Sequence, residues 1–197
     1  MWNIKLLGTD IYHLLAAFVI YSILGWCLES IYMSFCNKKL TNRGFAKSPF
    51  CPIYGFGGVL GYLILSPLAG NYVVLYFAGA ILATAFEFLV GNMMIFLFGE
   101  LWWDYNQKPF NYKGIICLES TIAWGVYALG IVGFVHKGIY SLVDRVDLGV
   151  GTKVVTVILC IVFVDYVIQL CRAFHVDLHK PKDFVLEKYR NFRSGRN

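Results

Sequence analysis

Residues 72–98 read YVVLYFAGAILATAFEFLVGNMMIFLF, and this stretch decides the fold class. It carries one charged side chain, Glu87, in a run longer than the roughly 20 apolar residues that a helix needs to cross a bilayer. The rest of the chain has the same character: of 197 residues, 58% are hydrophobic and 15% are charged, whereas soluble domains carry about 25% charged residues. The sequence therefore predicts an all-α integral membrane protein.

Five apolar segments are long enough, or nearly long enough, to span a membrane. They are residues 11–33, 53–68, 72–98, 114–135 and 152–171. The second is short, unless residues 45–52, which Pro49 and Pro52 keep from being helical, also enter the bilayer as irregular backbone. We predict a multi-pass bundle of about five transmembrane helices over residues 1–172 in the cell membrane. A basic tail, residues 173–197, follows and can form an interfacial helix.

Lys and Arg residues are distributed unevenly between the predicted spans. With the C-terminus in the cytoplasm and the N-terminus outside, thirteen of them lie on the cytoplasmic side and four on the outer side. Such clusters are typical of a cytoplasmic face beside anionic lipids, so the lipid bilayer is the expected partner and nucleic acid is not. This orientation predicts that Cys36 and Cys51 are labelled from the cytoplasmic side.

Four acidic residues interrupt the predicted spans: Glu29, Glu87, Glu119 and Asp165. An ionised acid at the bilayer centre costs about 2.5–3.5 kcal/mol on insertion scales, so four of them are too costly to be incidental. They either bond to polar groups of neighbouring helices as structural contacts or line one pocket that opens towards the cytoplasm. Small side chains, which let helices approach closely, share the helix face of Glu87; this face comprises Ala80, Ala83, Thr84, Glu87 and Gly91.

Glycines crowd the start of the second span, and Gly57 with Gly61 forms a G-x-x-x-G pair that is typical of close helix packing. The loop after residue 98 contains Trp102-Trp103-Asp104-Tyr105 and then Pro109-Phe110-Asn111. Paired Trp and Tyr at a helix end are typical of an interfacial belt. Asp104 and Asn111 among these aromatic residues favour a structured loop or the rim of a ligand site.

The sequence offers no support for a cofactor or a metal. None of the six cysteines forms a C-x-x-C pair, and His175 and His179, four residues apart in the tail, lack a third ligand. No nucleophile elbow or H-E-x-x-H motif is present, which favours a protein that is not an enzyme.

Several segments together resemble a known family. They are Gly25-Trp26 with Glu29, Asn42-Arg43-Gly44, Ser48-Pro49-Phe50-Cys51-Pro52-Ile53-Tyr54-Gly55, Glu87, Trp102-Trp103-Asp104-Tyr105, Pro109-Phe110-Asn111, Gly114 with Ile116-Cys117, and Trp124-Gly125. Their order and spacing are similar to the ABC-transporter type IV, or CmpB-like, membrane protein family over about residues 20–140. The chain departs from the family pattern at Ser48-Pro49, where Gly-Pro is expected, and at Glu119.

The resemblance implies a permease-like protein. Together with the interior acids, it selects ten candidate residues for a substrate or proton site: Trp26, Glu29, Arg43, Tyr54, Glu87, Trp103, Asp104, Asn111, Glu119 and Asp165. Arg43 is a candidate cationic partner for Glu29 or Asp104, because an Arg–carboxylate pair offsets part of the cost of burial.

Three functions follow from these features. The favoured one is a permease-like transport component with an acidic, inward-opening intramembrane site, in which Glu87 and Asp165 are candidate proton relays. Because the chain has no nucleotide-binding domain, such a component would work as a homo-oligomer or with a separate ATPase or other membrane partner. The alternatives are a membrane-embedded enzyme acting on a lipid substrate and a non-catalytic scaffold or sensor.

Overall fold

A computed structural model of the chain describes residues 2, 5–6, 9–40, 47–99 and 101–177. Its helices are α1 (Ile11–Asn37), α2 (Pro52–Leu65), α3 (Tyr72–Phe98), α4 (Leu118–Gly130), α5 (His136–Val143) and α6 (Leu148–Asp177). A 3₁₀ turn, η1 (Ser66–Leu68), extends α2, and a π-helical turn, η2 (Ile131–Val135), joins α4 to α5. Two-residue strands β1 (Lys5–Leu6) and β2 (Thr9–Asp10) pair before α1. Apart from this hairpin, the all-α prediction is confirmed.

Four helical segments in the described part of the chain are long and apolar enough to cross a membrane: Ile11–Phe35, Tyr72–Phe98, Leu118–Val143 and Leu148–Cys171. The fifth apolar element, Pro52–Leu68, is shorter, as its sequence predicted. The fourth span is shifted along the chain, because residues 102–117 form a loop and η2 continues the helix into α5. Residues 178–197, where the interfacial tail helix was expected, lie outside the described residues.

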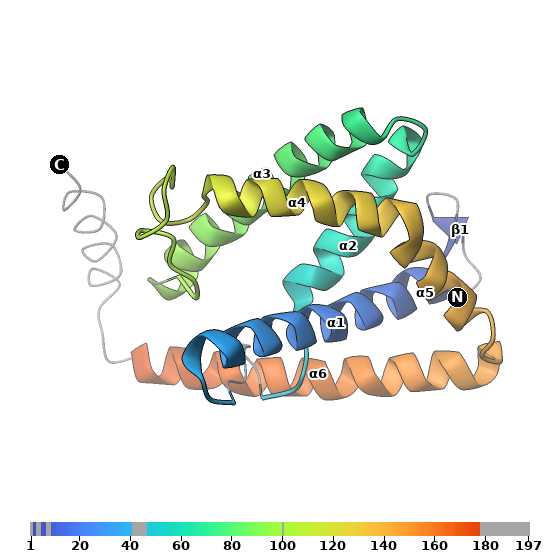
Figure 1. The fold of residues 1–197 in the computed structure, drawn as a ribbon. Coiled ribbons are helices and arrows are strands. Elements are labelled where there is room, and N and C mark those ends of the chain that lie inside the picture. Colours follow the sequence, from blue (N-terminus) through green and yellow to red (C-terminus); the bar gives the residue numbers. More distant parts are fainter. Residues whose placement is uncertain (1, 3–4, 7–8, 41–46, 100, 178–197) are drawn as a thin grey trace.

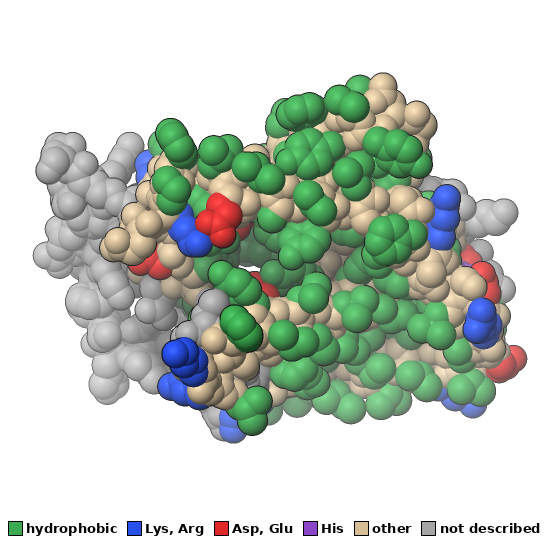
Figure 2. Space-filling model, viewed as in Figure 1, with side chains coloured by type: hydrophobic (Ala, Val, Ile, Leu, Met, Phe, Trp, Pro, Cys, Tyr) green, Lys and Arg blue, Asp and Glu red, His purple; other side chains and the backbone are tan. Residues whose placement is uncertain are grey.

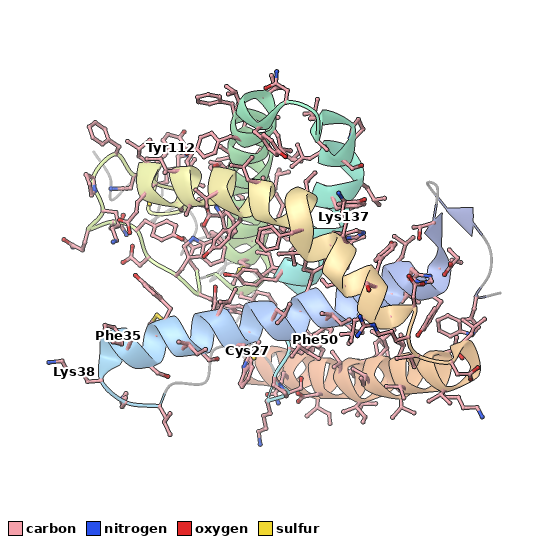
Figure 3. The ribbon with its side chains drawn as sticks, turned by 45° about the vertical axis from the view of Figure 1, so that its right-hand side comes forward. Cys27, Phe35, Lys38, Phe50, Tyr112 and Lys137 are labelled. Atoms are coloured by element: carbon pink, nitrogen blue, oxygen red, sulfur yellow. The ribbon has the colours of Figure 1, made fainter. Side chains whose placement is uncertain are left out.

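The helices alternate in direction (Figure 1). Helices α1, α3 and α6 run one way, and α2 and the α4–α5 segment return. The loop between α3 and α4, the end of α1 and the end of α6 therefore lie at one end of the bundle, which we call the loop end. The β1–β2 hairpin, η1 and the α5–α6 connection lie at the other, which we call the hairpin end. Figure 3 shows Lys38 and Tyr112 towards the loop end and Lys137 towards the hairpin end.

Two helix pairs form the centre of the bundle: α1 packs on α2, and α3 packs on α4. Local signals set their ends. The Asp10 side chain accepts a hydrogen bond from the backbone N–H of His13 at 3.0 Å and caps α1, and Asn71 caps α3 by accepting from Val73 and Val74. Gly99, with φ of 73°, ends α3 in the left-handed conformation that glycine adopts without strain.

Glycines permit the close approach of α1 and α2, but not the pair that the sequence suggested. A Cβ atom at Gly58 would lie 2.6 Å from the Tyr21 ring, and one at Gly55 would lie 2.6 Å from the Phe18 ring. A Cβ atom at Gly61 would meet nothing within 4 Å, and one at Gly57 would make ordinary contact with Phe86. The G-x-x-x-G expectation is therefore wrong for Gly61, because the face of α2 that meets α1 is set by Gly55 and Gly58.

The segment before α2 runs between α1 and α6 in a non-helical conformation. The backbone N–H of Cys51 donates to the carbonyl of Ser22, in the middle of α1, at 3.0 Å. From α6, Asp165 accepts from the N–H of Ser48 at 2.7 Å, and the Tyr166 hydroxyl donates to the carbonyl of Phe50 at 3.2 Å. The Phe50 side chain is 2% exposed, and Figure 3 shows it beside the middle of α1. The polar backbone groups of this irregular segment find their partners on α1 and α6.

Candidate functional site

Glu87 is the centre of a hydrogen-bonded cluster between α3, α4 and the loop that joins them. Its side chain projects from the middle of α3 and is 5% exposed. The Tyr105 hydroxyl donates to Oε1 at 3.0 Å, and the Trp124 Nε1–H and the Ser120 hydroxyl donate to Oε2 at 2.9 and 3.2 Å. We call these four residues the Glu87 cluster. The cost of placing a carboxylate in an apolar helix is offset by three donors from other elements.

The loop of residues 102–117 is folded against α3 and so brings Tyr105 to Glu87. The Trp103 Nε1–H donates to the carbonyl of Ile115 at 2.8 Å, and both side chains approach α3 at Gly91, where a Cβ atom would collide with Ile115. The loop is structured, as Asp104 and Asn111 had suggested. Burial raises the pKa of Tyr105. The negative charge of Glu87 and the hydrogen bond to Glu87 raise this pKa further, and Cys117 and Glu29 add smaller increases.

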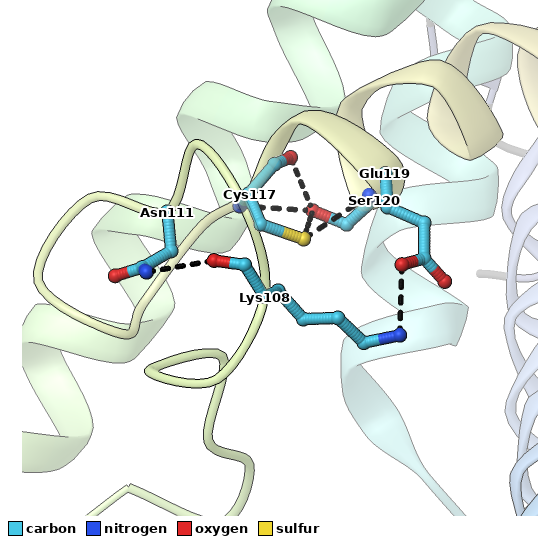
Figure 4. A network of polar contacts seen from close by, with 5 residues as sticks. All are labelled: Lys108, Asn111, Cys117, Glu119 and Ser120. Atoms are coloured by element: carbon cyan, nitrogen blue, oxygen red, sulfur yellow. Dashed lines mark hydrogen bonds and ion pairs between the residues drawn. The ribbon is translucent and has the colours of Figure 1, made fainter.

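Asp104 and Asn111 hold the loop together through short-range contacts. Asp104 Oδ1 accepts from the backbone N–H and the side-chain amide of Asn106 at 2.8 and 2.6 Å. The Asn111 amide donates to the carbonyl of Lys108 at 2.8 Å, a contact seen in Figure 4, and its Oδ1 accepts from the N–H of Gly114 at 3.2 Å. Both candidate residues therefore shape the loop that carries Tyr105.

A second carboxylate is joined to the Glu87 cluster through aromatic side chains. The Tyr54 hydroxyl, at the start of α2, donates to Glu29 Oε1, on α1, at 2.8 Å. The Tyr54 ring lies 6.4 Å from the Trp124 ring, centre to centre, and Trp124 bonds Glu87. The path Glu29–Tyr54–Trp124–Glu87 therefore connects the α1–α2 pair to the α3–α4 pair. Figure 2 shows a hollow between α1 and α4 with an acidic side chain at its edge.

The other two interior acids lie apart from this path. Glu119 is in the first turn of α4, where it pairs with Lys108 at 2.7 Å, and its side chain is 62% exposed (Figure 4). The hydrogen bond and negative charge of Glu119 raise the pKa of Lys108. Asp165 is bonded to Ser48 and Gln169. It belongs to α6, which lies on the opposite side of α1 from α3 and α4 (Figure 1). The structure therefore does not bring the four acids together in a single pocket.

The remaining candidates are distributed as follows. Trp26 is half-buried on α1, one turn from Glu29. Arg43, the expected cationic partner of Glu29 or Asp104, lies outside the described residues. Three donors of the Glu87 cluster are missing from the predicted site residues, namely Tyr105, Ser120 and Trp124. Ser120 and Trp124 lie four residues apart, which places them on one face of α4, and this spacing was the available signal.

Comparison with known proteins gives one match. The family model described as "Putative ABC-transporter type IV" matches residues 16–170. No curated protein and no solved structure matches the chain. The matched segment contains the Glu87 cluster, the Glu29–Tyr54 pair and all four membrane-capable helical segments in whole or in large part. The chain therefore belongs to the ABC-transporter type IV family that its sequence motifs indicated.

Proposed function

We propose that the chain is a permease-like component of a membrane transport system, and that the Glu87 cluster with the Glu29–Tyr54 pair forms its polar intramembrane site. The family and the apolar helices fit a membrane transport component. The observation that carries the finer proposal is the nearly complete burial of Glu87, an ionisable residue in the middle of a membrane-capable helix. Such residues are expensive to keep and mark substrate or proton pathways.

The geometry supports a site that can change its packing. The two carboxylates belong to different helix pairs, which meet where α2 packs on α3 and where the Tyr54 ring contacts Trp124, beside the hollow between α1 and α4. A relative movement of the two pairs would therefore separate Glu29 from Glu87 without breaking either pair internally. This is the kind of rigid-body movement on which alternating access depends.

The proposed site is acidic and carries no basic side chain among its described members. Glu29 and Glu87 would attract a proton or a cationic group, and the ring faces of Tyr54 and Trp124 would favour a cation as well. We assign the loop end, which the basic residues favour as cytoplasmic, as the side towards which the site opens. A second copy of the chain or a separate ATPase would complete the transporter.

The test of transport uses membrane vesicles from cells that produce the chain, so that natural partners are present. Wild-type vesicles are expected to accumulate at least one solute of a panel of labelled cations, amino acids and anions above the level of vesicles without the chain. Glu87→Gln is expected to lower this uptake strongly, whereas Glu119→Gln, which changes an exposed ion pair, leaves it near the wild-type level. A panel on which wild-type vesicles accumulate nothing contradicts the proposal.

The orientation is tested with cysteine labels in the two kinds of loop. Cys51 lies beside the middle of α1, and the side chain of Cys36 lies outside the described residues, so new positions are preferable. We expect Lys113→Cys, at the loop end, to react with an impermeant maleimide only after cells are permeabilised, and Arg145→Cys, at the hairpin end, to react in intact cells. Labelling in the reverse pattern would invert the orientation and place the opening of the site outside.

A further inference from the structure

A buried histidine lies at the other half of the bundle, away from the Glu87 cluster. His136 is 2% exposed and begins α5 directly after the π-helical turn η2. Its ring lies 3.4 Å from the Tyr62 ring at an angle of 12°, and 4.3 Å from the Tyr140 ring. On α1, the Tyr21 hydroxyl is 3.1 Å from His136 Nδ1. Three helices therefore enclose this imidazole with tyrosines.

One nitrogen of this imidazole is not satisfied by the protein. Nδ1 is paired with Tyr21, but Nε2 is buried without a hydrogen-bond partner among the residues that the structure describes. Buried polar atoms without a partner are rare, and each one calls for an explanation. The π-helical turn beside it is a second unusual feature, because such turns are rare and are frequently found at functional sites. Two unusual features at one position, the unpartnered nitrogen and the π-helical turn, indicate a function rather than packing alone.

The surroundings restrict what could bind at Nε2. In the described residues, no group of three His, Cys, Asp or Glu side chains is placed to hold a metal ion. The stacking distance of 3.4 Å leaves no room for an organic ligand between His136 and Tyr62. A proton needs no cavity. With Nδ1–H donating to the Tyr21 oxygen, Nε2 presents a free lone pair, and the faces of Tyr62 and Tyr140 would stabilise the imidazolium that forms.

A second histidine lies near His136, towards the hairpin end. There His13 is held between two carboxylates, with Nδ1 2.8 Å from Asp10 and Nε2 2.9 Å from Asp144, whose side chain is 67% exposed. The ring of Tyr140 lies 5.1 Å from that of His13 and 4.3 Å from that of His136. Tyr140 therefore separates an exposed histidine–carboxylate group from the buried histidine.

We propose that His136 is a proton-binding site, supplied from the Asp10–His13–Asp144 group at the hairpin end. The titratable groups that face it are Tyr21 from α1, Tyr62 from α2 and Tyr140 from α5 itself, whereas η2 contributes apolar side chains. The charged residues Asp10, His13 and Asp144 lie beyond Tyr140. Because α5 packs on α1 and η2 packs on α2, protonation of His136 would alter contacts in the outer half of the bundle whatever solute is carried. This inference does not depend on the role of Glu87.

The test is a histidine-labelled NMR titration of the full chain in lipid nanodiscs. His175→Gln with His179→Gln leaves two labelled imidazoles, His13 and His136, and the signal absent from the additional variant His136→Phe identifies His136. We expect the His136 signal to change with pH within the range in which the protein remains folded, because Nε2 takes up a proton there. We expect Tyr21→Phe, which removes only the hydroxyl, to shift the midpoint. A His136 signal that stays constant over the whole pH range in which the protein remains folded overturns the proposal.

The route is tested separately with Asp144→Asn. Loss of this carboxylate is expected to slow proton exchange at His136, measured as broadening of its signal, while leaving its midpoint within the titration range. Exchange at the wild-type rate would refute supply through the His13 group. If His136→Phe does not fold, His13→Gln in the same background leaves His136 as the sole labelled histidine, and the titration itself still decides the proposal.

Discussion

Gly55→Leu is expected to cause the largest loss of stability of any single substitution considered for this chain. A Cβ atom at residue 55 would already collide with the Ser22 hydroxyl and the Phe18 ring, and leucine adds three further carbons. Overpacking of a well-packed contact costs about 1–3 kcal/mol, and both colliding groups here are side chains of α1, so we expect a loss at the upper end, about 3 kcal/mol. The packing of α1 on α2 would open, and Tyr54 would move away from Glu29.

The matched control lies on the same helix. A Cβ atom at Gly61 meets nothing within 4 Å, so Gly61→Leu adds apolar surface that lipid can cover and removes a helix-weakening glycine. Both variants are measured by thermal unfolding in detergent, followed by tryptophan fluorescence. We expect a lower midpoint for Gly55→Leu and an equal or higher one for Gly61→Leu. Equal midpoints for the two variants would show that α1 and α2 do not meet at Gly55.

Glu87→Leu is expected to have the second largest effect. Leucine is close to glutamate in size but accepts no hydrogen bond, so the Trp124 N–H and the Tyr105 hydroxyl lose their acceptor inside the bundle. Each buried group left unpaired costs about 1–3 kcal/mol, which predicts a loss of about 2–6 kcal/mol. Ser120 loses less, because its hydroxyl also lies 3.0 Å from the carbonyl of Cys117.

Two other substitutions separate hydrogen bonding from charge. Glu87→Gln keeps one acceptor oxygen for Trp124 and can donate to Tyr105, so we expect a smaller loss of stability than for Glu87→Leu. Glu119→Gln breaks only an exposed ion pair, and such pairs contribute little to the free energy of unfolding. The measurement is the fraction of folded protein in a titration from mild detergent into dodecyl sulfate. If Glu87→Leu were as stable as Glu119→Gln, the cluster could not be formed as described.

The interior position of Glu87 could be predicted, because a single ionisable side chain in a long apolar helix is costly to expose to lipid and therefore faces the bundle interior. Its partners could not, since Tyr105 reaches it only through the fold of the 102–117 loop. Trp124 was equally hidden, because a tryptophan in a span gives no sign of whether its N–H meets lipid headgroups or a buried acid. Spacing along one helix reveals a face, but not which element covers that face.

The positions of Glu119 and Asp165 show where sequence reasoning failed in physical terms. The predicted span began at residue 114, which placed Glu119 well inside the membrane. Helix α4 begins at Leu118, so Glu119 stands at its end, where Lys108 can reach it. Asp165 is inside its helix as expected, but its partner is a backbone N–H of the 48–51 segment. Asp165 provides a hydrogen-bond acceptor for that irregular backbone. The residue spacing within α6 does not predict this partner.

The segment of residues 48–51 also has a consequence for the order in which the protein is made. It is made early in synthesis, but the acceptor for the Ser48 N–H and the donor for the Phe50 carbonyl both belong to α6, the last helix in the described part of the chain. Until α6 is made, these two groups lack the partners that they have in the folded protein. A nascent chain that has formed only α1 to α5 is therefore incomplete in its hydrogen bonding. The addition of α6 supplies the missing acceptor and donor.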